Sequence, residues 1–212
     1  MTEDEARGWM EAKFNVSREI WTRLDGYITL LLAEMENQNL IATSTRDHIW
    51  ARHIVDSAQL ISLAPIPKAD GGPWIDLGAG AGLPGMVVAI LSDWPVMLVE
   101  SRKGRVAFLQ AVVESLALTN VTVVGQRTEA MRPARPAQII SARAYAPLPR
   151  LLDSALHLAG RKTTWILPKG KNWQNELEIA RPMWQSVFHV EQSVTDGESA
   201  ILVMRGIKKK GG

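Results

Sequence analysis

The sequence has no cysteine in its 212 residues. This absence excludes disulfide bonds, thiolate ligands for a metal and cysteine nucleophiles. No metal site of any other kind is expected from the sequence either.

A long apolar run is also missing, because no stretch approaches the roughly 20 residues that cross a bilayer. The acidic start, residues 2–5, is unlike a signal peptide. We therefore expect a cytoplasmic protein with no membrane partner. Neither sign of charge dominates, since 24 Lys and Arg stand against 22 Asp and Glu. The isoelectric point near 9.0 still admits a polyanionic partner.

The hydrophobic content of 46% is ample for a globular core. Residues 1–70 are predicted to form an N-terminal helical cap. Three helices are expected in this cap, and each begins at a residue that can cap it: Thr2, Ser17 and Ser44. The last of the three is expected to end near Leu63.

The centre of the sequence is a glycine-rich stretch after a short apolar run at residues 74–77. Four glycines fall within eight positions, 78–85, and the apolar run 86–91 follows. A strand, a glycine turn and a helix in this order begin a nucleotide-binding unit. Two patterns fit this stretch: the G-x-G-x-x-G of dinucleotide binding and the acidic-x-G-x-G-x-G of S-adenosylmethionine-dependent methyltransferases.

From residue 74 onward, strand-like and helical runs alternate, which predicts an α/β fold with a parallel sheet. The predicted strands cover residues 74–77, 96–100, 121–124, 138–141 and 164–167. Two more, 186–194 and 199–205, flank an Asp-Gly hairpin turn. We expect a Rossmann-like sheet of seven strands, with helices on both faces, as in class I methyltransferases. This domain is assigned to residues 71–207, followed by a basic flexible tail at 208–212.

Two carboxylates flank the glycine stretch. Glu100 ends the second predicted strand, twenty positions after Gly80, where a cofactor ribose would present its hydroxyls. The other interpretation is a strand-end acid facing water. Asp76 either faces the methionine part of a cofactor or bonds to loop amides, and the sequence does not choose between these roles.

Two further segments follow predicted strands at the edge where ligands bind. Residues 127–130 lie where an adenine would be recognised. Arg143 follows the fourth strand, and it is predicted to hold either a cofactor carboxylate or a substrate phosphate. The alternative for Arg143 is a structural ion pair with a nearby acid.

Many cations also follow the predicted strands, so they are expected at the same edge. This arrangement is typical of a surface that seats a phosphate backbone, although a solvated rim has the same composition. The candidates for RNA contact are Arg102, Lys103, Arg105, Lys169 and Lys171.

Residues 52–57 contain His, Asp and Ser, yet they lie too close together in one helix to form a hydrolase triad. Arg52 and Asp56, four residues apart, are predicted to pair with each other. His53 and Ser57 remain candidates on the substrate side, together with Lys169, and no catalytic residue is assigned.

Residues and motifs that the sequence lacks also limit which atoms the protein could methylate. Without cysteine, covalent methylation at carbon 5 of a pyrimidine is excluded. Asn-Pro-Pro-Tyr and Asp-Pro-Pro-Tyr are missing, which disfavours the exocyclic amine of adenine. Guanine N7 already carries a free lone pair, so it needs orientation but no general base.

Over nearly its whole length, the sequence resembles the small-subunit ribosomal RNA guanine-N7 methyltransferases, also called glucose-inhibited division protein B. The resemblance rests on residues 39–41, 52–57, 76–85, 100–101, 108–109, 142–144 and 169–170. It implies S-adenosylmethionine as cofactor and 16S rRNA or the small ribosomal subunit as partner. We also expect the protein to be a monomer. The implied cofactor site includes Gly78, Leu83, Thr128, Glu129 and Arg143, beside the loop residues Asp76, Gly80, Gly82 and Glu100.

One position departs from this family. Gly104 stands where members usually carry lysine, so a contact with RNA or cofactor there is in question. Two other functions are kept as alternatives. A small NAD-dependent oxidoreductase is disfavoured by the missing second half-fold, and a non-catalytic RNA- or nucleotide-binding module would bind cofactor without methyl transfer.

Overall fold

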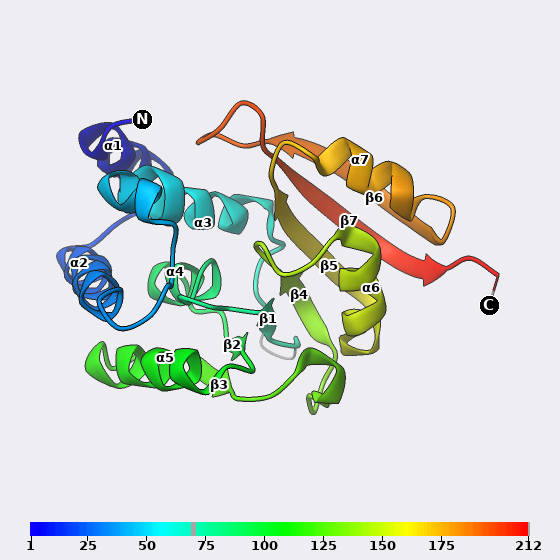
Figure 1. Cartoon of the computed structure of the whole chain (residues 1–212), viewed down its shortest axis with the longest axis horizontal. Coiled ribbons are helices and arrows are strands. Elements are labelled where there is room, and N and C mark those ends of the chain that lie inside the picture. Colours follow the sequence, from blue (N-terminus) through cyan, green and yellow to red (C-terminus); the bar gives the residue numbers. More distant parts are fainter. Residues whose placement is uncertain (69–70, 212) are drawn as a thin grey trace.

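A computed structural model describes residues 1–68 and 71–211, and its strands form one mixed sheet (Figure 1). The strand order is β3-β2-β1-β4-β5-β7-β6, with β7 antiparallel to both of its neighbours. The predicted seven-stranded sheet is therefore confirmed. The strands are β1 (Trp74–Leu77), β2 (Val96–Val99), β3 (Val121–Val124), β4 (Ala137–Ser141), β5 (Ala159–Lys169), β6 (Trp184–Gln192) and β7 (Ala200–Lys209).

Helices cover both faces of the sheet, as predicted (Figure 1). One face carries α1 (Glu3–Lys13), α2 (Arg18–Glu34), α3 (Asp56–Ala58), α4 (Gly85–Leu91) and α5 (Lys103–Ser115). The other face carries α6 (Leu148–Ala155), continued by η5 (Leu156–Leu158), and α7 (Trp173–Ala180). The short η4 (Thr128–Ala130) lies between β3 and β4.

The third helix expected in the N-terminal part is not a regular α-helix. It consists of η1 (Thr43–His48), the π-helical η2 (Trp50–Val55), α3 and η3 (Gln59–Leu63) in succession. Ser44 does not cap it, because the residue before η1 is Ala42, whose carbonyl accepts the hydroxyl of Thr45. Thr2 and Ser17 do cap α1 and α2 through their hydroxyls.

The N-terminal helices share a core with the sheet. Buried side chains of α1 and α2, such as Met10 and Leu31, belong to the same cluster as Val87 of α4 and Leu98 of β2. Tyr27 of α2 is also fully buried, and its hydroxyl donates to the carbonyl of Ala81 at 2.9 Å. Residues 1–68 therefore pack directly on the glycine-rich loop.

Two local expectations differ from the structure. The sequence spacing over residues 105–118 predicts an inner helix face made of Val106, Leu109, Val113 and Leu116. In the structure the buried residues of α5 are Phe108, Leu109 and Val112, and the other three predicted positions are only partly buried. Strand β7 also extends to Lys209, where pairing with β6 orders residues 208 and 209 of the expected flexible tail. Among the described residues, no helix is both long and apolar enough to span a membrane.

Candidate functional site

The glycine-rich loop joins β1 to α4 at the carboxyl edge of the sheet. Gly78 and Gly82 have φ values of +62° and +97°, which side chains with a Cβ rarely adopt. A Cβ on Gly78 would lie 2.6 Å from the ring of Tyr145. Glycine at position 78 is therefore required both by the backbone conformation and by the aromatic ring packed against it.

Asp76 supports this loop from below. Its side chain is fully buried; one carboxylate oxygen accepts the Gly85 amide at 2.9 Å and the other accepts the Ser141 hydroxyl at 2.7 Å. The Ser141 hydroxyl in turn accepts the indole N–H of Trp74 at 2.8 Å. Burial raises the pKa of Asp76 to about 7. Of the two roles considered for Asp76, the contacts favour bonding to the loop.

Glu100 also binds loop amides. One of its oxygens accepts the amides of Ser101 and Arg102 at 2.7 and 2.9 Å, and the other accepts the Gly80 amide at 3.1 Å. The guanidinium of Arg105 lies 3.7 Å from that second oxygen. Glu100 is thus a nearly buried anchor that joins the end of β2 to the glycine loop.

A cavity of about 440 Å³ opens beside Glu100. Of the predicted cofactor residues, Gly78, Glu100, Thr128 and Glu129 line it. Gly80, Gly82 and Leu83 belong to the same loop, but they are buried and do not line the cavity. Four arginines also line it: Arg102, Arg105, Arg127 and Arg150.

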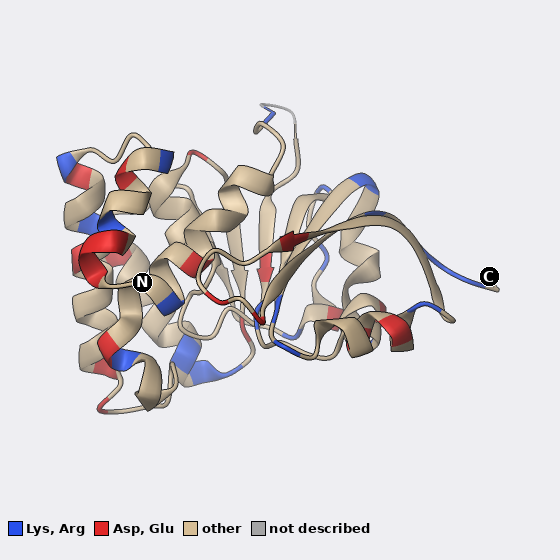
Figure 2. Cartoon of the chain, turned by 90° about the horizontal axis from the view of Figure 1, so that it is seen from above, with Lys and Arg blue, Asp and Glu red and all other residues tan. Residues whose placement is uncertain are grey.

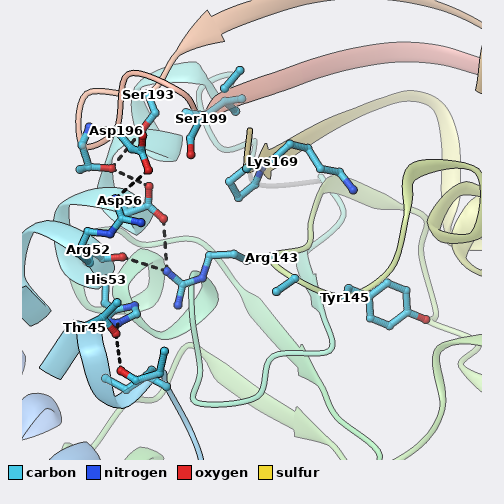
Figure 3. Close-up of a pocket in the computed structure, with 18 of the residues that line it drawn as sticks. Thr45, Arg52, His53, Asp56, Arg143, Tyr145, Lys169, Ser193, Asp196 and Ser199 are labelled. Atoms are coloured by element: carbon cyan, nitrogen blue, oxygen red, sulfur yellow. Dashed lines mark hydrogen bonds and ion pairs between the residues drawn. The ribbon is translucent and has the colours of Figure 1, made fainter. Parts of the chain in front are cut away.

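Figure 3 shows residues that line a second cavity, of about 720 Å³. Ala144 and Tyr145 line both cavities, so the two spaces meet at this point. Ala144 has φ +52°, a left-handed conformation that costs roughly 1–2 kcal/mol for a residue with a Cβ. The turn at Ala144 separates Arg143, on the larger cavity, from Tyr145, which faces both.

Ion pairs form part of the wall of the larger cavity (Figure 3). Arg143 approaches Asp56 with 3.3 Å between Nη1 and Oδ2, and Arg52 approaches Asp196 with 2.9 Å between Nη1 and Oδ2. The predicted pair of Arg52 with Asp56 is wrong. Arg52 lies in the π-helical turn, which changes the spacing from that of an α-helix, and the β6–β7 turn offers Asp196 instead.

Asp56 is the centre of this network. Besides Arg143, its carboxylate accepts the Thr195 hydroxyl at 3.0 Å and the Gln59 amide at 3.0 Å. These contacts tie the N-terminal helices to the β6–β7 hairpin and to the end of β4. They also correspond to the alternative considered for Arg143, a pair with a nearby acid.

His53 lines the same cavity and is uncharged at neutral pH. Burial, with the charges of Arg143 and Arg52, lowers the pKa of His53 to about 3. The Thr45 hydroxyl donates to the Ala42 carbonyl, so it accepts from His53 Nε2, 2.7 Å away. Nδ1 is then an acceptor, and it is buried without a partner. An uncharged His53 is an unsuitable proton donor.

Ser57 and Lys169 are the other two substrate-side candidates. Ser57 is buried and donates to the His53 carbonyl at 2.6 Å, so its hydroxyl proton is already engaged within the chain. Lys169 lines the cavity, but its ammonium group binds Glu176 at 2.8 Å and its side chain is only 8% exposed. The charges of the larger cavity therefore balance, since Arg52, Arg143 and Lys169 each face a carboxylate.

The five RNA candidates differ in availability. Arg105 and Lys169 are engaged by Glu100 and Glu176. Arg102, Lys103 and Lys171 are exposed, and no ion pair joins them to another described residue. Arg102 and Lys103 follow β2 and Lys171 follows β5, and Figure 2 shows blue segments at this end of the parallel strands.

Gly104, where the sequence departs from the family pattern, lies at the start of α5. It is exposed in the first turn of α5, and its carbonyl accepts the Gln38 amide at 3.1 Å. A Cβ at this position would lie 3.4 Å from the Gln38 side chain, so a larger residue fits.

Several residues of the site were not predicted from the sequence: Tyr27, Thr45, Ser141, Tyr145, Ser193, Thr195 and Asp196. Most are single polar residues whose partners lie far away in the chain, and they form no local motif. Tyr27 had one signal, because a hydroxyl on the buried face of an amphipathic helix requires a partner. No group of three or more potential metal ligands occurs among residues 1–68 and 71–211.

Comparison with known families matches residues 20–203 to the family GidB, described as rRNA small subunit methyltransferase G. The relatives that carry the name ribosomal RNA small subunit methyltransferase G include the following two. The one from Sphingopyxis alaskensis is 52% identical, over 95% of this chain and 85% of its own. The one from Zymomonas mobilis is 47% identical, over 99% and 96%.

Solved structures share the fold at low sequence identity. A mutant of MtNAS in complex with S-adenosylmethionine has a TM-score of 0.60 at 13% identity, covering 96% of this chain and 83% of that one. TYW2 from M. jannaschii, in complex with AdoMet, has a TM-score of 0.56 at 12% identity, covering 74% and 76%. These likenesses confirm the Rossmann-like methyltransferase fold.

Proposed function

Because the chain belongs to the GidB family of rRNA small subunit methyltransferase G, we propose that it methylates N7 of a specific guanine in 16S rRNA. S-adenosylmethionine is the methyl donor. The observation that carries the proposal is the pair of adjoining cavities that meet at Ala144 and Tyr145, one built on the glycine loop and one on the ion-pair network.

The smaller cavity suits the cofactor. Left-handed Gly78 keeps its wall free of a Cβ, and Glu100 and Thr128 supply polar groups beside it. We assign the ribose and adenine to this cavity, next to Glu100 and the Thr128–Glu129 segment. The methionine part then extends toward the junction, where Arg143 is the cation available to its carboxylate.

The larger cavity suits the target base. When bound, the cofactor supplies an electrophilic methyl group on its sulfonium. A guanine held in the larger cavity presents the N7 lone pair, so no proton has to be removed before transfer. This chemistry agrees with a cavity in which His53 stays neutral and every carboxylate is already paired. The role of these residues is to orient the base and exclude water.

Exposed cations extend this site outward. Arg102 and Lys103 precede and begin α5, while Lys171 follows β5, so all three stand at the carboxyl edge near the cavities. We propose that they contact phosphates flanking the target guanine. Arg105 and Lys169 take structural positions instead. The protein acts on the rRNA as a monomer in the cytoplasm.

The test is transfer of labelled methyl groups to unmodified 16S rRNA, both naked and in assembled small subunits. Label in the RNA is the expected result. A Lys103→Ala/Lys171→Ala double variant should lower the yield without changing cofactor affinity, because neither side chain lines the smaller cavity. Cofactor binding with no label in either RNA would favour a non-catalytic binding module. A thermal shift with NAD but none with S-adenosylmethionine would favour an oxidoreductase.

A further inference from the structure

The edge of the sheet opposite the cofactor carries a second cationic groove. Its volume is about 740 Å³, and it is lined by the amino ends of β4 and β5, by the segment before β1 and by Arg205 of β7. Because β4 and β5 are parallel, the groove lies a strand length away from the glycine loop. Five residues of β4, at about 3.3 Å each, separate the two edges by roughly 17 Å.

The described residues that line this groove carry charge of one sign only. Four cations line it: Lys68, Arg161, Lys162 and Arg205. No acid is among the lining residues that the structure describes, in contrast to the balanced cavity at the other edge. The described lining thus carries four positive charges, although the formal net charge of the whole chain is only +2.

The cations are also available to a ligand. All four are exposed, and Lys68, Arg161 and Lys162 form no ion pair with another residue in the described part of the chain. Arg205 is held by a bond from Nε to the Thr164 hydroxyl at 3.1 Å. In Figure 2, blue segments lie at this end of the strands as well as at the cofactor end.

The groove has a polar floor. Gln138 donates to the Ile66 carbonyl at 3.3 Å, and its side-chain oxygen is buried without a partner. The Thr163 hydroxyl is buried and bridges the Gly160 amide and the Ala137 carbonyl. Arg161 and Lys162 therefore project from a stretch of β5 that is fixed at both Gly160 and Thr163.

We infer that this groove binds the phosphate backbone of the rRNA substrate at a point remote from the methylated guanine. Exposed cations without acid partners attract phosphates by charge and counterion release, with no need for a particular base. Such a contact would position a folded RNA against the protein while the other edge holds the target. The inference rests on the proposed function, because it takes rRNA as the ligand.

The experiment compares an Arg161→Ala/Lys162→Ala variant with a control, Lys13→Ala/Arg18→Ala. The control removes the same charge at exposed N-terminal positions that form no ion pair with described residues. Affinity for naked 16S rRNA is measured at several salt concentrations, and cofactor affinity by calorimetry. The groove variant should lose rRNA affinity on the order of tenfold, and its log–log salt slope should become shallower by about 1.4 for two lost contacts.

The control should keep the slope of the wild type, and cofactor affinity should stay unchanged in both variants. A groove variant with the wild-type slope, or an equal loss in the control, would overturn the inference. Weakened binding to assembled subunits with unchanged binding to naked rRNA would also overturn it, in favour of an acidic protein partner. If the wild type itself neither binds nor methylates rRNA, the proposed function is wrong, and the inference that rests on it is wrong as well.

Discussion

Arg143 and Asp56, 87 positions apart in the chain, form an ion pair of 3.3 Å at the wall of the larger cavity. The pair joins the end of β4 to the N-terminal helices next to the junction of the two cavities. Arg143 can therefore serve both the fold and the cofactor, since its side chain keeps 21% of its exposure.

Arg143→Ala should weaken S-adenosylmethionine binding by about 1–3 kcal/mol, the range for loss of a charge-assisted hydrogen bond. Calorimetric titration measures this directly. Arg52→Ala is the matched control, because Arg52 pairs with Asp196 in the same cavity and should leave cofactor affinity unchanged. Equal affinities for the Arg143 variant and the wild type would place the methionine carboxylate elsewhere.

Glu100→Ala should weaken S-adenosylmethionine and S-adenosylhomocysteine alike. The variant leaves the amides of Gly80, Ser101 and Arg102 without their acceptor, so it should also lower the free energy of unfolding by about 1–3 kcal/mol. Calorimetry and denaturant unfolding test the two effects separately. A variant with full cofactor affinity would remove Glu100 from the site, whatever its stability.

The raised pKa of Asp76 predicts that the free energy of unfolding depends on pH. Its pKa rises from an ordinary value of 3.8 to about 7 in the folded protein, so between these values the folded state binds the extra proton. The contribution of Asp76 to stability is therefore greatest below pH 4, falls as the pH rises toward 7, and is constant above that.

Unfolding by denaturant from pH 4.5 to 8 checks this sign by comparing the wild type with Asp76→Asn. As the pH rises, the unfolding free energy of the wild type should fall relative to that of Asp76→Asn. His53 titrates in the opposite sense over part of the range, since its pKa is lowered, but it is common to both proteins. A pH-independent difference would mean that Asp76 stays ionised throughout.

Gly104 allows a comparison of charge with helix propensity. Gly104→Ala should stabilise the protein by about 0.5–1 kcal/mol, because glycine is disfavoured within a helix and the added Cβ has room. Gly104→Lys should in addition tighten RNA binding and steepen its salt dependence, whereas the alanine variant should not. Identical RNA binding by the two variants would show that position 104 does not contact RNA.

The sheet and the glycine loop could be predicted because their signals are local. Apolar runs, glycines at 78–85 and the Asp-Gly turn depend on neighbouring residues, and the structure has them where expected. The ion pairs could not be predicted in this way. Arg52 meets Asp196 across 144 positions, and no sequence spacing encodes that distance. The π-helical turn also altered the local geometry on which the pairing of Arg52 with Asp56 was predicted.

The central claim is methyl transfer to guanine N7, and mapping of the modified atom tests it most directly. Unmodified 16S rRNA is incubated with the protein and S-adenosylmethionine, then treated with reagents that cleave the strand only at N7-methylguanine. A single new cleavage site, lost when Glu100→Ala replaces the wild type, is the predicted result. Methylated RNA that resists this cleavage, with the label on another base or atom, would contradict the account.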